Sequence, residues 1–148
     1  MIAIGSDHGG YLLKEELKKY LDEKEIPYVD FGTDSEERTD YPVFAKKVAL
    51  AVQNKECDKG ILVCGTGFGM TIIANKFKGI RCASCWNEDV AKLFKGHNDG
   101  NVIALPGRFI NVSQAVSILR AWLGSEFMEG RHTERLQMIE DVENENMK

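Results

Sequence analysis

The sequence has 148 residues, of which 43% are hydrophobic and 28% charged, and this length and composition are typical of one folded domain. Its 19 basic and 23 acidic residues give a formal net charge of −4 with no basic block, which argues against a nucleic-acid or membrane-surface partner. The longest wholly apolar run, residues 48–52, is too short to span a membrane, and the first residues lack a basic secretory start. We therefore expect a cytoplasmic protein.

Short apolar runs alternate with helical patterns along the chain, without a repeat or a linker. Strands are predicted at residues 2–5, 28–31, 60–64, 80–86 and 102–105. Helices are predicted at residues 10–24, 42–54 and 70–78, after the N-cap Asn87, at residues 112–123 and from about residue 131. This alternation predicts one α/β domain over residues 1–148, a three-layer, doubly wound sheet of five parallel strands in the order 2-1-3-4-5.

In such a sheet, ligands bind beyond the carboxyl ends of the first and third strands, where the strand order reverses. The turn after the first strand contains Asp7 and His8, a carboxylate and a titratable imidazole, followed by two glycines. The alternative interpretation of this turn is a polar helix cap. We expect it to contribute to a site because the glycines allow close approach of the backbone.

The turn after the third strand, residues 64–69, has three glycines and leads directly into a predicted helix. Free backbone N–H groups in such a turn favour anion binding, and the alternative is a plain tight turn. A dinucleotide-binding fingerprint would need glycine in place of Met70, and no Gly-Lys-Ser/Thr of a Walker loop follows.

Cys64 ends the third predicted strand, where N–H dipoles favour a thiolate, so it is a candidate nucleophile or base. A lone cysteine is more often a small buried side chain. Cys82 and Cys85 match the C-x-x-C pattern but lie within a predicted strand rather than at a helix start. We interpret this pair as packing residues and keep redox or metal binding as the alternative.

Two further segments are unusually polar. Residues 97–101, His-Asn-Asp-Gly-Asn, are predicted as a turn before the fifth strand, with an Asx-rich loop as the alternative. Arg131 and Arg135 lie one helical turn apart, and Arg108 follows the fifth strand. Paired arginines suit a dianion such as phosphate, although a solvated basic face is equally compatible with the pattern.

Taken together, these segments closely resemble the type B ribose-5-phosphate isomerases, a family that includes the galactose-6-phosphate isomerase subunits. The likeness runs in register along nearly the whole chain. The matching stretches are Gly5-Ser6-Asp7-His8-Gly9, Gly32-Thr33, Glu37-Arg38-Thr39-Asp40-Tyr41-Pro42, residues 60–69, Ala74-Asn75-Lys76-Phe77-Lys78-Gly79-Ile80-Arg81, His97-Asn98-Asp99, Gly130-Arg131-His132 and Arg135.

The resemblance implies interconversion of ribose 5-phosphate and ribulose 5-phosphate through an enediolate, with no metal or organic cofactor. Cys64 is implied as the base, because the family's alternative, a glutamate after the glycine turn, is replaced by Met70. The turn would hold the enediolate oxygen, with Thr66 donating to the same oxygens. The implied contacts in the turn are Gly65, Thr66, Gly67, Phe68 and Gly69.

The resemblance also implies that His97 opens the sugar ring, helped by Asp7 and Tyr41, so we expect Cys64, the glycine turn and His97 to lie together. The implied phosphate ligands are Arg131 and Arg135, with His8, Asn98 and Arg108 as further contacts.

The family builds its site where two subunits meet, so the resemblance implies a homodimer or dimer of dimers. The C-terminal helix would take part in this assembly, and its arginines would reach a neighbour's glycine turn. Two positions depart from the family pattern: Phe68 puts a bulky ring in the turn, and Gly100 stands where threonine is expected. The alternative substrates are allose 6-phosphate and galactose 6-phosphate, and the alternative to an enzyme is a non-catalytic module that binds a phosphorylated ligand.

Overall fold

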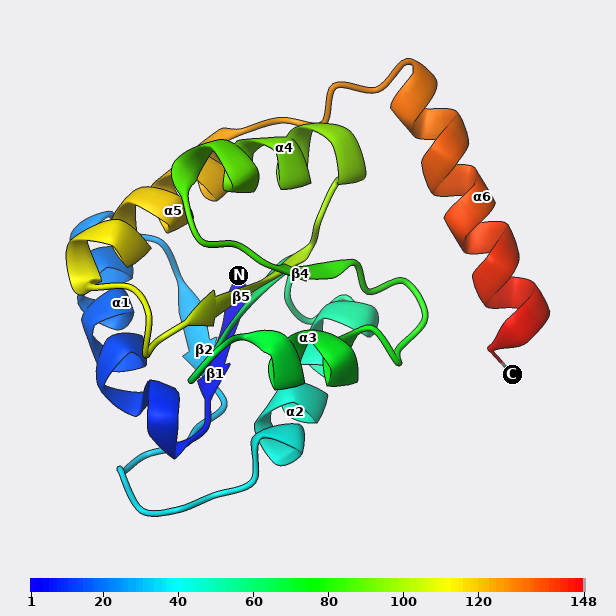
Figure 1. Cartoon of the computed structure of the whole chain (residues 1–148). Coiled ribbons are helices and arrows are strands. Elements are labelled where there is room, and N and C mark those ends of the chain that lie inside the picture. Colours follow the sequence, from blue (N-terminus) through cyan, green and yellow to red (C-terminus); the bar gives the residue numbers. More distant parts are fainter. Residues whose placement is uncertain (148) are drawn as a thin grey trace.

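The computed structural model describes residues 1–147, and its middle layer is a parallel sheet (Figure 1). The strands are β1 (Ile2–Ser6), β2 (Tyr28–Asp30), β3 (Lys59–Cys64), β4 (Cys82–Ser84) and β5 (Val102–Pro106). The helices are α1 (Tyr11–Glu23), α2 (Tyr41–Gln53), α3 (Phe68–Ala74), α4 (Glu88–Asn98), α5 (Val112–Gly124) and α6 (Arg131–Asn146), with a short 3-10 helix, η1 (His8–Gly10), before α1. The predicted α/β class and the parallel sheet are confirmed.

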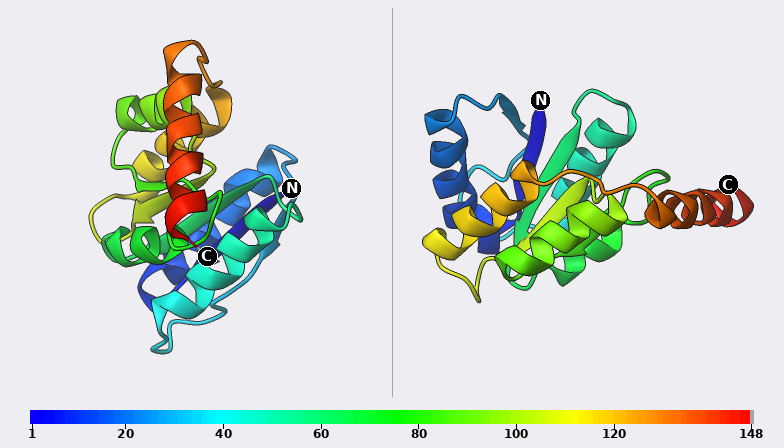
Figure 2. Two further views of the ribbon diagram at one scale, coloured as in Figure 1. Left: turned by 90° about the vertical axis from the view of Figure 1, so that its right-hand side faces the viewer. Right: turned by 90° about the horizontal axis from the view of Figure 1, so that it is seen from above.

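Helices cover both faces of the sheet (Figure 2). One apolar core forms between the sheet and helices α1, α4 and α5, and a second core forms between the sheet and helices α2 and α3. Strands β1 and β5 are buried along their whole length, as expected for parallel strands covered on both faces.

The predicted strand order is wrong in its last two members, because the observed order is β2-β1-β3-β5-β4. Strand β5 is entirely buried and lies beside β3, whereas β4 is short, only partly buried and lies at the edge. A right-handed return from β4 to β5 places α4 on the face of α1 and α5, where Ala91 and Phe94 are buried. The reversal between β1 and β3 is unaffected.

The outer edge of β4 is covered by a side chain. The amide group of Asn75 donates to the carbonyl oxygen of Cys82 and accepts from its N–H, both at 2.8 Å. This pairing imitates a neighbouring strand and protects an edge that would otherwise be open to association.

Two helix boundaries differ from the prediction in ways that affect the site. Helix α3 begins at Phe68 rather than at residue 70, so part of the glycine turn lies in its first turn. His97 and Asn98 form the end of α4 instead of a turn before β5, and Asp99, in a left-handed conformation at φ 45°, closes the helix.

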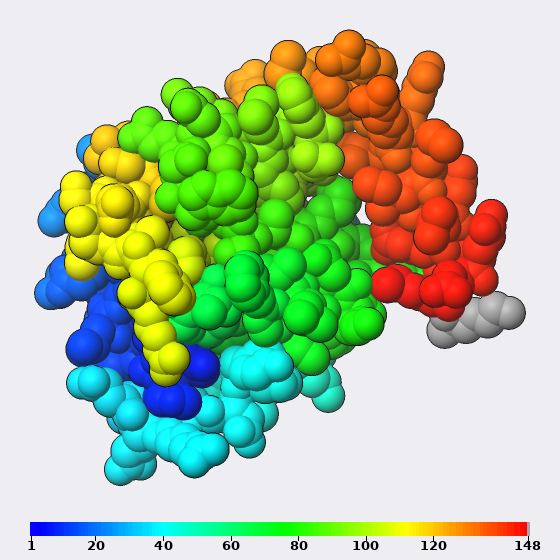
Figure 3. Space-filling view, in the orientation of Figure 1, coloured from blue at the N-terminus to red at the C-terminus, as the bar shows by residue number. Residues whose placement is uncertain are grey.

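Helix α6 projects from the body of the molecule and forms a separate ridge on its surface (Figures 1 and 3). His132 is its one buried residue within the part of the chain that the structure describes. Along residues 1–147, no helix combines the length and the apolar character that crossing a membrane requires.

The structure also accounts for Gly100, which is buried beneath the ring of Phe94. A Cβ atom at position 100 would lie 2.0 Å from Phe94 Cζ, so core packing requires glycine here.

We predict that Gly100→Thr lowers the free energy of unfolding by about 1–3 kcal/mol through overpacking, measured by denaturant titration. The penalty should shrink in a Phe94→Ala background, and a wild-type unfolding curve for Gly100→Thr would contradict this account.

Candidate functional site

The loops after β1, β3 and β5 meet at the carboxyl edge of the sheet. The backbone N–H of Asp7 donates to the carbonyl oxygen of Val63 at 3.3 Å, and the N–H of Arg108 donates to that of Gly65 at 3.0 Å. These bonds hold the three loops side by side at the reversal of strand order, where ligands bind in folds of this kind.

Cys64 points its sulfur into the glycine turn. Its Sγ accepts a hydrogen bond from the Gly67 N–H at 3.2 Å, and the residue is 5% exposed. Gly67 has φ +82°, and a Cβ atom there would lie 2.5 Å from Ser84 Oγ, so only glycine fits at the start of α3. The N–H dipole directed at the sulfur stabilises negative charge on it.

The amides of the turn divide into two sets. Those of Gly67 and Phe68 donate to side chains of the turn itself, to Cys64 Sγ and Thr66 Oγ1 at 3.2 Å each. The amides of Gly65, Thr66 and Gly69 have no acceptor within residues 1–147. Three of the five amides in the predicted cradle are therefore available to a ligand oxygen.

Two side chains lie directly against glycines of this turn. A Cβ atom at Gly65 would lie 3.1 Å from Arg108 Cδ, and one at Gly69 would lie 2.5 Å from Tyr41 Cε1. The side chain of Arg108 and the ring of Tyr41 thus border the free amides. Arg108 is exposed and makes no ion pair with another residue in the described part of the chain.

Asp7 and His8 are both oriented by hydrogen bonds. Asp7 Oδ1 accepts from the Gly10 N–H at 3.1 Å, so this carboxylate does cap η1, as the alternative interpretation held. His8 Nδ1 accepts from the Thr39 N–H at 3.1 Å, and the His8 N–H donates to Thr39 Oγ1 at 3.1 Å. His8 Nδ1 also lies 3.2 Å from the Thr39 carbonyl oxygen, so Thr39 contacts the ring through both its N–H and its carbonyl group.

The remaining predicted site residues gather where α4 ends and α6 begins. The ring of His97 stacks on that of His132, with centroids 4.4 Å apart and planes inclined by 12°. Burial lowers the pKa of His132, and the charges of His97, Arg131 and Arg135 lower it further. Asn98 lies beside His97 at the end of α4, so this corner combines a positive potential with hydrogen-bonding groups.

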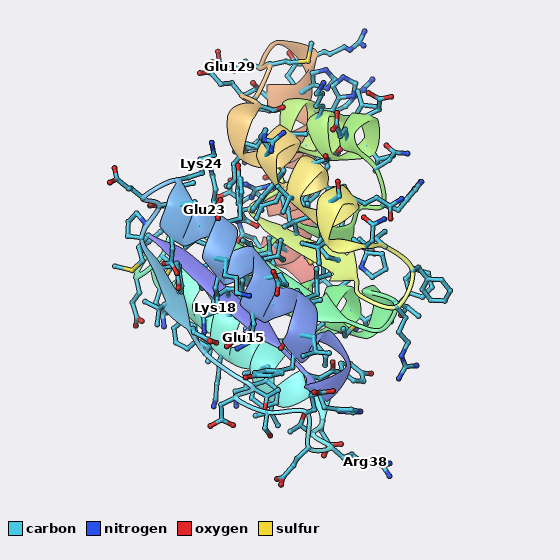
Figure 4. The ribbon with its side chains drawn as sticks, turned by 90° about the vertical axis from the view of Figure 1, so that its left-hand side faces the viewer. Glu15, Lys18, Glu23, Lys24, Arg38 and Glu129 are labelled. Atoms are coloured by element: carbon cyan, nitrogen blue, oxygen red, sulfur yellow. The ribbon has the colours of Figure 1, made fainter. Side chains whose placement is uncertain are left out.

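The two groups of residues lie at opposite edges of the sheet. Cys64 pairs with Pro106 at the end of β5, whereas the segment after His97 enters β5 at Val102, which pairs with Gly60. Four strand residues at ~3.3 Å each separate the two edges by about 13 Å. Figure 4 shows Arg38, in the loop before α2, and Glu129, just before α6, at opposite ends of the molecule. Within one chain, the structure therefore does not bring Cys64 and His97 together.

Cys82 and Cys85 are both buried and free. Burial raises the pKa of each thiol to about 12, so both remain protonated near neutral pH. This protonation favours the packing interpretation over metal or redox use.

Three residues near the site escaped the sequence reasoning. Thr39 holds His8, His132 stacks on His97, and Ser84 Oγ donates to the Thr66 carbonyl oxygen at 3.3 Å. Thr39 and His132 lie within the stretches that match the family, so the resemblance could have identified them. Ser84 lies outside those stretches.

A sequence model described as Ribose/Galactose Isomerase matches residues 2–139 of the chain. The chain belongs to the ribose/galactose isomerase family. Ribose-5-phosphate isomerase B of Escherichia coli (strain K12) is 47% identical to this family member over 142 residues, which are 96% of this chain and 95% of that protein. Ribose-5-P isomerase B of Listeria innocua is 43% identical, over 98% of each chain.

Solved structures of the family agree with the fold. Ribose-5-phosphate isomerase B of Clostridium thermocellum superposes with a TM-score of 0.96 at 46% identity, covering 97% of each chain. The enzyme of Mycoplasma genitalium, solved with bound ribulose-5-phosphate, superposes with a TM-score of 0.93 at 39% identity and covers 98% of this chain and 97% of that one. The resemblance found in the sequence is confirmed, and the chain is a sugar isomerase.

The lowered pKa of His132 predicts how pH affects the anchoring of α6. Because the folded-state pKa lies below the ordinary 6.5, the unfolded chain binds more protons between the two values. Stability is therefore lost as pH falls below the ordinary pKa. His132→Phe keeps a stacking ring without the titration, so its free energy of unfolding should fall less than that of the wild type between about pH 7.5 and about pH 5.5. An equal fall in the two proteins would contradict the prediction.

Proposed function

We propose that this chain interconverts ribose 5-phosphate and ribulose 5-phosphate at a site that two copies build together. The observation that carries the proposal is the sulfur of Cys64, held on the Gly67 amide beside three free amides at the reversal of strand order. The names of the relatives support the substrate, since two of them are ribose-5-phosphate isomerases and one of the solved structures binds ribulose-5-phosphate.

The isomerisation begins with the Cys64 thiolate, which takes the proton from C2 of the open-chain aldose. The electron pair of the broken C–H bond forms a C1=C2 double bond, and the C1 carbonyl oxygen becomes the charged O1 of an enediolate. The free amides of Gly65, Thr66 and Gly69 donate to this oxygen, and each such donor contributes about 3 kcal/mol.

The ketose forms when the proton on Cys64 returns to C1 and the O2 hydroxyl proton moves to O1. We assign this transfer between oxygens to the Thr66 hydroxyl. Its Oγ1 accepts from the Phe68 N–H at 3.2 Å, which orients the oxygen and leaves its proton free to be donated. All protons are thus conserved between the aldose and the ketose.

The assignment of Cys64 as the base is supported by what stands next to it. Met70 occupies the position of the alternative base in the family, and its side chain is fully buried and has no titratable group. Cys64, in contrast, has a thiol that can accept a proton, and its sulfur is hydrogen-bonded to the Gly67 amide of the turn.

The second copy supplies His97, Arg131 and Arg135. The two arginines suit the phosphate dianion, and His97 suits the exchange of protons in ring opening. In that step a proton leaves the O1 hydroxyl towards Asp7, and the ring oxygen receives a proton from His97 as the C1–O4 bond breaks. Tyr41 borders the sugar, and the remaining contacts are His8, Asn98 and Arg108.

Helix α6 supports an assembly with shared sites. Its apolar side chains Met138, Ile139 and Val142 are 64%, 41% and 60% exposed and line an open groove between α6 and the body of the molecule. A second copy packed against α6 would cover this surface while bringing the start of α6 to a glycine turn. A homodimer is the smallest assembly that satisfies both requirements.

The base is tested by Cys64→Ala, with Cys57→Ala as the control that removes a buried thiol just before the opposite end of β3. In the presence of EDTA, the wild type should convert ribose 5-phosphate into a ketose phosphate. Cys64→Ala should lose a factor of about 10²–10⁴ in kcat, and the control should lose little. Full activity of Cys64→Ala would exclude this sulfur as the base.

The substrate is tested by comparing kcat/KM for five- and six-carbon sugar phosphates. A higher kcat/KM for allose 6-phosphate or galactose 6-phosphate than for ribose 5-phosphate would contradict ribose 5-phosphate as the substrate.

The shared site is tested by mixing two inactive variants, Cys64→Ala and His97→Asn, under conditions that exchange subunits. A hybrid dimer then contains one wild-type site and one site that lacks both groups. Equal mixing makes half of the dimers hybrids, so about a quarter of the wild-type activity should return. Mixtures that stay inactive despite hybrid dimers, detected by mass spectrometry, would show that no site is shared in this way.

A further inference from the structure

Lys14 is a fully buried lysine whose ammonium the proposed reaction does not use. It lies on α1 with a 0% exposed side chain. Its Nζ donates to Asp30 Oδ1 and Oδ2 at 2.8 and 2.7 Å and to the Thr33 carbonyl oxygen at 2.6 Å. The Tyr11 ring, at 5.4 Å, and Glu15, at 3.8 Å, complete its surroundings. Replacing a buried ion pair by apolar side chains is often neutral or stabilising, so fold stability alone does not explain this lysine.

Asp30 has other partners besides Lys14. Lys18 Nζ donates to Asp30 Oδ2 at 2.9 Å, and the Gly32 N–H donates to Oδ1 at 2.9 Å. Burial raises the pKa of Asp30, but the bonds from Lys14, Lys18 and Gly32 outweigh it and hold the pKa below its ordinary value. Figure 4 shows Lys18 and Glu15 on the same stretch of α1, beside β2. Lys14 alone of the two lysines binds Thr33 and both oxygens of Asp30, whereas Lys18 pairs with Glu15 Oε2 at 2.7 Å.

Residues 31–33 anchor the start of the loop between β2 and α2 to β1. The carbonyl oxygen of Gly32 accepts from the Ser6 N–H at 2.7 Å, and the Thr33 N–H donates to the carbonyl oxygen of Ser6 at 2.8 Å, one residue before Asp7. Thr33 is the residue of this segment whose carbonyl oxygen Lys14 holds. Residues 34–40 are exposed or half-buried, and the next tertiary anchor is Thr39, which holds both the backbone and the ring of His8. The loop then leads to Tyr41, whose ring lies on Gly69.

We propose that Lys14 is a positioning residue of the isomerase: by holding Thr33 it fixes residues 33–40 and so orients His8 and Tyr41 at the carboxyl edge. Lys14 itself does not touch the substrate. This role rests on the proposed function, since it assumes that His8 and Tyr41 border the sugar. The claim that Lys14 anchors the loop does not depend on the proposed function.

Hydrogen–deuterium exchange tests the anchoring, with Lys14→Met compared with Lys18→Met. Both variants remove one positive charge from the same carboxylate, but only the first removes the bond to Thr33. Lys14→Met should speed exchange of the Thr33 and Thr39 amides, which donate to Ser6 and His8, about tenfold or more and leave β1 and β3 protected, while Lys18→Met should leave both amides unchanged. Equal effects of the two variants, or a uniform rise over all strands in Lys14→Met, would overturn the proposal.

Kinetics then test the link to the site. Lys14→Met should lower kcat/KM for ribose 5-phosphate about tenfold, and Lys18→Met should leave it unchanged. In a Thr39→Val background, where the loop has already lost its hold on the His8 backbone, the effect of Lys14→Met should shrink to less than about twofold. Additive effects would point to general destabilisation and contradict the positioning role. A wild type without isomerase activity would refute the proposed function, whereas the exchange comparison would still decide whether Lys14 anchors the loop.

Discussion

The parallel arrangement of the strands constrains where chemistry can take place in this molecule. Every strand ends at one edge of the sheet, and every connecting helix returns the chain to the other edge. Cys64 ends β3 and His97 lies in the last turn of α4, so the two belong to opposite edges of the sheet whatever their side chains do. The stack of His97 on His132 then fixes the start of α6, with its two arginines, at the same edge as His97. In the proposed dimer, a second copy would bring the two groups together without any change in the fold of either chain.

The sequence predicts well the features that local chemistry determines. Continuous apolar runs mark the buried strands, and the glycines of residues 65–69 mark a turn whose backbone must leave the ordinary regions, as φ +82° at Gly67 shows. Strand order is not local in this sense. It depends on which face of the sheet receives α4, and therefore on the packing of Ala91 and Phe94 against α5, which is distant in sequence. The interchange of β4 and β5 could not be foreseen from either strand alone.

Functional positions were harder to predict where polarity and burial disagree. Residues 97–101 have the composition of a loop, yet the first two continue α4, because the helix ends only where Asp99 turns left-handed. Gly100 is required by the Phe94 ring above it, a neighbour that no local sequence pattern reveals. Lys14 did leave a signal, since it lies three residues before Leu17 and seven before Leu21 on the apolar face of α1. A charged side chain on the buried face of a helix indicates an oppositely charged or hydrogen-bonding group buried next to it.

Rigid and adaptable parts of the carboxyl edge have different tasks. Cys64 and the free amides are placed by β3 and the start of α3, so the sheet and its core would set the geometry of the proposed proton transfer. His8 and Tyr41 instead depend on the exposed segment 33–40, which is held at Thr33 and Thr39 and has few other contacts. Such a segment gains little order from apolar burial, so its order has to come from directed polar bonds at its anchors. A buried ammonium is suited to this, because its hydrogen bond to a carbonyl is stronger in a low-dielectric surrounding and is not shared with water. The cost of burying Lys14 is then offset by the order that it gives to the loop.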